Sequence, residues 1–331
     1  MESNRYDSDW RPASCWVITQ KRESDYGGRD GREIHGEAIA LAAGVAPSLK
    51  RVSALPMFSF SNLFGNPPKD GALTPPWPEL VIAVGRQGLR WARWVRKQSG
   101  GKTFLAVLQK PAFPFHGADF IWAPSHDRLR GKNAVSSLFS PHPFTAQKLQ
   151  AAAGRLAERF GKLPRPHVGV LIGGTSRAYR FTDGDMERLC SSLRQVAERD
   201  GAGLIVTTSN RTAQTHCRLL EQRLAGLPAL LWDRSERDFY PALLGTADVF
   251  IATPDSVNMI SEAAGTGKPI LLFPMEAGSS RFRRFHEEIK QRGITRPLGE
   301  RLEFWDYSPV NATEEIATAL LDAMRKHRGR A

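Results

Sequence analysis

The chain has 331 residues, of which 41% are hydrophobic and 24% are charged, a composition typical of soluble globular proteins and a length sufficient for two α/β domains. No apolar run reaches the length of a membrane-spanning helix, and the first residues lack the apolar core of a signal peptide, so we expect a cytoplasmic protein. Three distant cysteines without a C-x-x-C pair favour reduced thiols over disulfides or structural zinc: Cys15, Cys190 and Cys217.

The formal net charge of +12 is spread over several stretches rather than gathered in one run. Helical faces and anion sites explain this pattern, and no recognisable RNA- or DNA-binding module is present, so we do not expect a nucleic-acid partner. Residues 55–73 are apolar and aromatic and are flanked by Lys50, Arg51 and Lys69. This segment indicates either peripheral contact with an anionic membrane surface or an ordered interdomain loop.

The first half alternates short apolar runs with polar turns and helical stretches, a pattern that predicts a parallel sheet. We expect strands at residues 15–19, 80–84, 104–108 and 119–123, and helices at 33–43 and 89–98. A helix over 145–160 then leads into a linker rich in Gly and Pro at 161–166. We therefore assign residues 1–160 to a first Rossmann-like domain.

The second half repeats the alternation of short apolar runs, polar turns and helical stretches. Strands are expected at 167–172, 203–208, 229–232, 249–253 and 270–273, with helices at 183–200, 212–224, 237–246, 256–264, 281–293 and 313–326. Residues 167–300 form a predicted nucleotide-binding domain, and 301–331 a helical extension that packs back on the first domain. The predicted fold class is α/β, with two parallel-sheet domains facing a cleft.

Four turns of the second half are expected at the carboxyl edge of its sheet, where α/β proteins hold ligands. Glycine amides, hydroxyl groups, an arginine fork and a helix N-terminus together suit a diphosphate. On the following helix, Glu262 is a candidate acceptor for the hydroxyl groups of a ribose diol; the alternative is a solvated helix residue or a salt bridge. The residues of these turns are Gly173, Gly174, Thr175 and Ser176; Ser209 and Arg211; Asp255 and Ser256; and residues 276–284. In the last turn, Arg281 and Arg284 either form a basic stripe on the diphosphate or acceptor side of the site or are solvated charges on a helix.

Several familiar motifs are absent. Gly267-Lys268 follows a helix instead of opening one, which excludes a P-loop, and Gly173-Gly174 lacks the G-x-G-x-x-G spacing of a dinucleotide fold. No catalytic triad, paired carboxylates or metal-ligand spacing stands out, so we expect no metal site. In the first half, His126 and Asp127 are the candidate catalytic pair, and a loop hydrogen bond is their alternative explanation.

The order of these motifs resembles the elongated-mitochondria fission proteins of plants and their bacterial homologues, a family similar to the GT-B fold of nucleotide-sugar glycosyltransferases. The most specific pieces are 255–269, which contains Met259, and the Arg281-Phe282-Arg283-Arg284-Phe285-His286 run. In GT-B enzymes resembling MurG, the residue placed like Glu262 contacts the ribose, and turns placed like Gly173-Gly174 face the diphosphate. The resemblance thus implies a nucleotide site that includes Met259.

The first half departs from this family at two places. Relatives carry Gly-Lys-Pro-Gly-His-x-Asn-Gln where this chain has Gly28-Arg29-Asp30-Gly31-Arg32-Glu33-Ile34-His35, and Asp-Pro-Arg where it has Lys110-Pro111. In GT-B enzymes the first domain binds the acceptor. The resemblance therefore implies that nucleotide binding is retained while the acceptor or the catalysis differs.

The sequence predicts a GT-B-type protein that binds a nucleoside-diphosphate sugar in the interdomain cleft and transfers or remodels the sugar, without a metal or further cofactor. The alternative is a non-catalytic membrane-peripheral or scaffold protein on the same frame, and a nucleotide-sugar epimerase is a third option. The base, the sugar, the acceptor, the retention of catalysis and the oligomeric state are left open.

Overall fold

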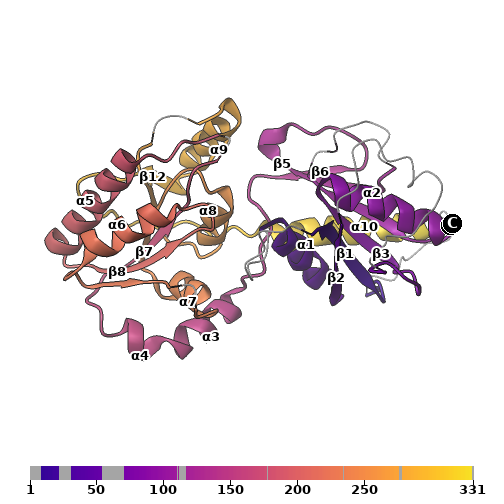
Figure 1. Cartoon of the computed structure of the whole chain (residues 1–331). Coiled ribbons are helices and arrows are strands. Elements are labelled where there is room, and N and C mark those ends of the chain that lie inside the picture. Colours follow the sequence, from indigo (N-terminus) through magenta and orange to yellow (C-terminus); the bar gives the residue numbers. More distant parts are fainter. Residues whose placement is uncertain are drawn as a thin grey trace. The chain divides into compact units, whose positions relative to one another are not determined.

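The computed structural model describes residues 9–21, 31–53, 71–109, 111, 117–176, 178–233, 235–275 and 278–329. The predictions for residues 54–70, for Gly28–Asp30 of the glycine-rich loop, for Lys110 and for residues 276–277 lie outside these residues. The chain forms two compact units, Met1–Pro143 with Ala312–Ala331, and Phe144–Asn311 (Figure 1). The chain therefore enters the second unit once and returns to the first for its last helix.

The first unit is built on a six-stranded parallel sheet with the order β2-β1-β3-β4-β5-β6. The strands are β1 (Cys15–Gln20), β2 (Pro47–Val52), β3 (Leu80–Val84), β4 (Phe104–Leu108), β5 (Phe120–Pro124) and β6 (Ala134–Ser137). The central strands are buried along their whole length because helices cover both faces of the sheet. The helices of this unit are α1 (Gly31–Ala42), α2 (Gly85–Gln98), the short 3₁₀ turn η2 (Ser125–Asp127) and α10 (Ala312–Arg328).

Alternate residues of β1 show which helix covers which face of this sheet. Trp16 and Ile18 belong to one buried cluster with the apolar side of α2. Val17 points the other way, towards α1, where a Cβ added to Gly36 would lie 2.8 Å from its Cγ1. Behind α1, Ala43 packs with Ala317 and Leu321 of α10, and α1 and α10 thus form the second helical layer of the unit.

The second unit carries another six-stranded parallel sheet, with the order β12-β11-β10-β7-β8-β9. Its strands are β7 (His167–Ile172), β8 (Gly203–Thr208), β9 (Ala229–Leu231), β10 (Val249–Ala252), β11 (Ile270–Leu272) and β12 (Thr295–Pro297). Counted from β7, the chain winds outward in one direction to β9 and then in the other to β12. This is the doubly wound Rossmann order, whose topological switch point lies between β7 and β10.

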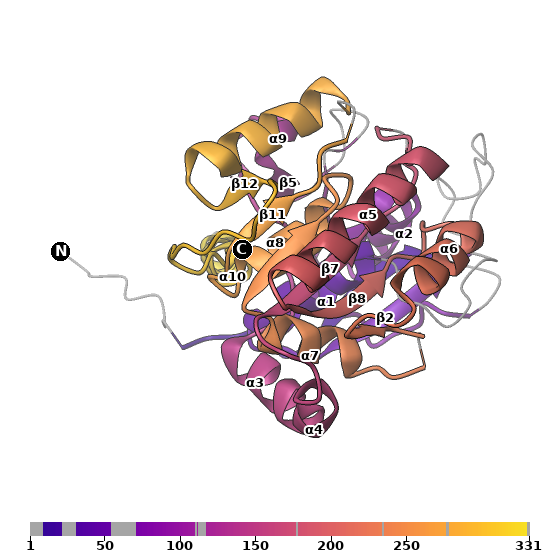
Figure 2. The same ribbon diagram turned by 90° about the vertical axis from the view of Figure 1, so that its left-hand side faces the viewer.

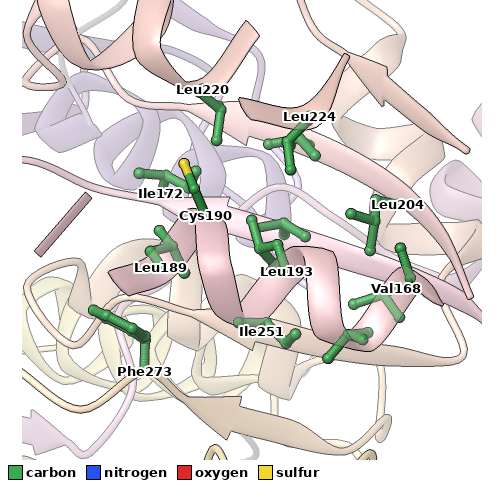
Figure 3. Close-up of a cluster of buried hydrophobic side chains, with 14 of the residues drawn as sticks. Val168, Ile172, Leu189, Cys190, Leu193, Leu204, Leu220, Leu224, Ile251 and Phe273 are labelled. Carbon is green, nitrogen blue, oxygen red and sulfur yellow. The ribbon is translucent and has the colours of Figure 1, made fainter. Parts of the chain in front are cut away.

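Helix α5 (Asp183–Arg199) closes one face of this sheet. Its residues Leu189, Cys190 and Leu193 are buried against Val168 and Ile172 of β7 (Figure 3). On the opposite face, a Cβ added to Gly169 would lie within 3 Å of Leu243 on α7 (Phe239–Thr246). The other helices of this unit are α3 (Ala146–Arg155), α4 (Ala157–Phe160), α6 (Gln214–Leu224), α8 (Val257–Ala264) and α9 (Ser280–Gln291).

The structure confirms the predicted fold class of two parallel α/β sheets. It also contains three strands that the sequence analysis did not predict, β2, β6 and β12. All three lie at a sheet edge. An edge strand has a neighbour on one side only and does not need the continuous apolar run of a central strand, so its sequence gives a weak signal.

The boundary between the units lies before the helix predicted at 145–160, which the sequence analysis assigned to the first domain. The structure divides this helix at Leu156, where φ is −110° and ψ is 13°. Its first part, α3, lies beside α7 of the second unit (Figure 2). The two backbones approach closely because residue 245 has no side chain: a Cβ added to Gly245 would lie 2.5 Å from the carbonyl oxygen of Leu149.

Candidate functional site

The switch point of the second sheet brings together two of the predicted turns. Gly173 and Gly174 follow β7, and Asp255 and Ser256 follow β10, the strand hydrogen-bonded to β7. The loops after these strands lead to helices on opposite sides of the sheet, which opens a crevice at the carboxyl edge. This is the place where open α/β sheets bind their ligands.

Asp255 joins three loops at this edge. Its side chain is fully buried and lies 2.8 Å from Nη2 of Arg211, after β8. Its Oδ2 also accepts the backbone N–H of Gly174, after β7, at 2.9 Å. Its Oδ1 accepts the hydroxyl of Thr253 at 2.7 Å. Three donors thus compensate for the burial of the charged carboxylate.

Close packing within the loops explains why both predicted glycines are needed. A Cβ added to Gly173 would lie 2.1 Å from Oδ2 of Asp255, and one added to Gly174 would lie 2.2 Å from the carbonyl oxygen of Arg211. Their amides also have acceptors within the protein, since Gly173 donates to the Thr253 hydroxyl at 2.8 Å and Gly174 to Asp255. The glycines therefore let the loops meet each other.

The turn after β8 is held by its own polar groups. The hydroxyl of Ser209 accepts the backbone N–H of Arg211 at 3.1 Å, and the hydroxyl of Thr212 accepts that of Ser209 at 3.1 Å. Thr212 also donates to the carbonyl oxygen of Gly173. The guanidinium of Arg211 remains partly exposed, with 38% of its side-chain surface accessible, but the Asp255 carboxylate offsets its charge.

The hydroxyl groups of Thr175 and Ser176 shape the loop that leaves β7. Ser176 Oγ accepts the backbone N–H groups of Ala178 and Tyr179 at 3.2 and 3.1 Å. Thr175 Oγ1 accepts the N–H of Phe181 at 3.2 Å. These bonds direct the loop towards α9, where the buried ring of Tyr179 meets that of Phe282 edge-on at 5.5 Å.

Helix α8 begins at the switch point with Val257. Ser256 is its N-cap residue and is buried, but its side chain makes no capping hydrogen bond. The first amides of a helix have no partner within the helix and carry the positive end of its dipole. Val257, Asn258 and Met259 are all partly exposed in this first turn. Among the predicted groups, these amides are the ones best placed to receive an anion.

Glu262, on the same helix, is hydrogen-bonded to a residue that the sequence analysis did not identify. Its Oε2 accepts the hydroxyl of Tyr240, which lies on α7. Burial raises the pKa of Glu262 to about 7, and the Tyr240 hydrogen bond opposes this shift. The pKa of Tyr240 is also raised, first by burial and then by the nearby Glu262. The carboxyl group therefore changes its charge close to neutral pH.

Helix α9 adds a histidine at the same edge. Nε2 of His286 donates to the carbonyl oxygen of Pro254 at 2.8 Å, and burial lowers the pKa of the ring, so that it is neutral. Its Nδ1 is buried and has no hydrogen-bond partner among the described residues. Arg281 and Arg284 are exposed on this helix. An open depression of 850 Å³ runs along it, lined by Arg283, Arg284, Glu287, Glu288 and Arg292 among others.

The candidate catalytic pair of the first half belongs to the first unit. His126 and Asp127 form η2 at the carboxyl end of β5, and His126 is buried. Its Nε2 lies 4.0 Å from Oδ1 of Asp127, which is beyond hydrogen-bond distance.

The described ranges lack two features. They contain no group of three or more His, Cys, Asp or Glu side chains arranged to hold a metal ion. No helix within them combines the length and apolar character needed to cross a bilayer. All three cysteines are free, and burial raises the pKa of Cys190 to about 11.

Known proteins resemble the chain along most of its length. The model of the family described as mitochondrial fission ELM1 matches residues 31–324. The mitochondrial fission protein ELM1 of Arabidopsis thaliana is 27% identical over 270 residues, which are 73% of this chain but only 63% of that protein. An uncharacterised protein of Rickettsia prowazekii (strain Madrid E), RP120, is 23% identical over 285 residues, covering 75% of this chain and 80% of the relative.

Solved structures show what the two units share with other proteins. UDP-GlcNAc 2-epimerase from Methanocaldococcus jannaschii aligns with a TM-score of 0.57 at 11% identity, covering 95% of this chain and 99% of that one. MnaA of S. aureus, in a co-structure with UDP, aligns with a TM-score of 0.51 at 11% identity, covering 94% and 87%. At such low identity the likeness shows a common GT-B-type fold. Together with the family match, these findings show that the chain belongs to the mitochondrial fission ELM1 family.

Proposed function

We propose that the protein binds a nucleoside-diphosphate sugar on its second unit and transfers or remodels the sugar. The observation that carries this proposal is the start of α8 at the switch point, with a cap residue whose side chain leaves the first amides available. A diphosphate placed there would meet the positive end of the helix dipole. The structural likeness to nucleotide-sugar epimerases supports the same ligand class.

In this proposal the carboxylate of Glu262 accepts hydrogen bonds from the ribose hydroxyl groups. Tyr240 binds one oxygen of the carboxylate, and within the described residues its other oxygen makes no hydrogen bond, so it remains available to a ribose diol. Arg211 and the amides of α8 would stabilise the negative charge of the leaving diphosphate, which is the main contribution expected of the protein to sugar transfer. Met259, one turn before Glu262, would pack against the nucleoside.

Calorimetry and thermal shift with UDP, GDP, CDP and ADP sugars test the proposal. A ligand at a hundred times its Kd should raise the free energy of unfolding by about 2.7 kcal/mol. Glu262→Gln should weaken nucleotide binding, whereas the matched change Glu221→Gln, on the exposed side of α6, should leave it unchanged. The absence of stabilisation by every sugar nucleotide at millimolar concentration would contradict the proposal.

A second candidate function is a non-catalytic scaffold on the same fold. It is favoured by the hydrogen bonds within the site, because Asp255, Arg211 and Thr212 bond to the protein's own loops. Such a protein would retain the GT-B frame without a substrate. If this candidate is correct, no nucleotide sugar should stabilise the protein against unfolding, but the protein should associate with a membrane in flotation assays or with another protein in pull-down assays.

A further inference from the structure

Helix α2 of the first unit carries a row of cations along one side. Arg86, Arg90, Arg93 and Lys97 are spaced four, three and four residues apart. With 3.6 residues per turn, these positions fall within an arc of roughly 60° and extend over roughly 16 Å of the helix. Three of the four side chains are exposed, and Arg90 is partly buried. We call these four residues the α2 stripe.

Among the described residues, three of the four members of the stripe, Arg86, Arg93 and Lys97, have no acidic partner. Helix α2 contains no Asp or Glu. Within the described part of the chain, Arg86, Arg93 and Lys97 make no ion pair, whereas Arg96, on another side of the helix, lies 2.9 Å from Asp119. Like charges three or four residues apart repel each other, and a cation in the first turn opposes the helix dipole. Only Lys97, in the last turn, is favourably placed with respect to the helix dipole, so helix stability does not explain the row, and we infer that it serves an external anion.

The opposite side of α2 fixes the helix firmly to the sheet. Trp91 and Trp94 are buried, with their rings packed edge-on at 6.1 Å. Trp94 also meets Trp77 at 5.6 Å, and Trp77 meets Trp16 of β1 at 6.0 Å. The stripe is thus held on a rigid base, with its charges in one line on the outer surface.

We propose that the α2 stripe is the surface by which this protein binds an anionic phospholipid membrane. A straight row of cations matches the flat, negatively charged plane of headgroup phosphates, near which each basic residue increases binding about five-fold. The stripe does not resemble a site for single-stranded nucleic acid, because the tryptophans of α2, Trp91 and Trp94, are buried on the other side of the helix and cannot stack on bases.

The neighbouring chain also favours a lipid over a nucleic acid. The indole N–H of Trp91 donates to the carbonyl oxygen of Ser53 at 3.3 Å, and Leu73 packs in the same cluster as Trp91. Ser53 and Leu73 thus both lie against the buried side of α2, and the sequence between them is rich in Phe, Leu and Met. A sequence of this composition is typical of peripheral membrane contact. The proposed surface itself consists of the α2 stripe alone.

Vesicle flotation of the full chain tests the proposal, with phosphatidylcholine vesicles that contain or lack phosphatidylserine. The stripe variant combines Arg86→Gln, Arg93→Gln and Lys97→Gln. The control variant combines Arg218→Gln, Arg301→Gln and Lys326→Gln, three exposed residues with no partner in the described chain, so that both variants lose the same charge. Thermal unfolding checks the fold. The stripe variant should be about as stable as the wild type, because the repulsion removed within α2 offsets the lost interaction of Lys97 with the helix dipole.

We expect the wild type to bind phosphatidylserine vesicles, with binding lost at 1 M salt, where the screening length is about 3 Å. The stripe variant should bind on the order of a hundred-fold more weakly, and the control variant only a few-fold. The proposal is overturned if the wild type does not bind phosphatidylserine vesicles, if both variants lose vesicle binding equally, or if the stripe variant binds the vesicles as strongly as the wild type. It is also overturned if single-stranded RNA, added as a competitor, is bound in preference to the vesicles.

Discussion

Replacement of Asp255 by Asn is the sharpest test of how the candidate site is built. The side chains are similar in shape, but Asn is neutral and has one acceptor oxygen where the carboxylate has two. The variant therefore loses its attraction to Arg211 and the acceptor of either Gly174 or Thr253. Breaking a buried charge pair costs about 3–5 kcal/mol, and the lower end applies because water reaches the Arg211 guanidinium, which is 38% exposed.

We therefore expect a loss of about 3 kcal/mol in the free energy of unfolding, and a midpoint about 6–12 °C lower for a unit of this size. Calorimetry measures the midpoint, and hydrogen exchange at the Gly174 amide locates the change. The control Glu198→Gln removes an exposed ion pair with Arg194 and should change stability by less than about 1 kcal/mol. Arg211→Gln combined with Asp255→Asn should cost less than the sum of the two changes.

A wild-type unfolding midpoint with unchanged exchange at Gly174 in the Asp255→Asn protein would refute this reasoning. It would mean that the three loops keep their arrangement without the carboxylate. Their order would then come from backbone packing alone.

Three further predictions concern other parts of the chain. Gly174→Ala should destabilise the protein by about 1–3 kcal/mol in urea unfolding, because its Cβ has no room, while Gly154→Ala in α3, with nothing within 4 Å, should stabilise it by up to about 1 kcal/mol. Because the pKa of Glu262 rises from 4.5 to about 7, the folded chain binds an extra proton between these values, so the free energy of unfolding should fall as the pH rises through that window. Urea unfolding at pH 5 and pH 8 measures this fall, which should be smaller in Glu262→Gln; an equal fall in both proteins would contradict the shift. The triple change Phe58→Ser, Phe60→Ser and Phe64→Ser should weaken vesicle flotation if residues 55–73 contact lipid, and equal flotation of mutant and wild type would exclude that segment as an anchor.

The sequence was sufficient for the central strands of both sheets, because each is a continuous run of apolar residues between polar turns. The edge strands β2, β6 and β12 were not predicted because they lack such a run. For example, β2 includes Lys50 and Arg51 and is half-exposed. The strand order, which locates the switch point, depends on pairings between distant segments such as β7 and β10. No local pattern encodes such a pairing.

The candidate site, like the fold, could be predicted from the sequence only in part. Turn chemistry identified Gly173, Gly174 and Asp255, yet it could not show that these residues would bond to one another, because 81 positions separate Gly174 from Asp255. Tyr240 gave no signal, since a tyrosine at the start of a helix is ordinary until Glu262 is known to lie against it. The resemblance placed Glu262 on a ribose, and that role remains a prediction.

The return of the chain to the first unit has a consequence for synthesis on the ribosome. The second unit is one continuous segment, Phe144–Asn311, and all its strands are available once that segment has emerged. The first unit is made earlier but lacks α10, whose Thr313 exchanges two hydrogen bonds of 2.9 Å with the backbone of His142, and whose Ala317 covers Ala43. Its apolar layer stays uncovered until α10 is made, so the first unit can complete its fold only after the second unit has been synthesised.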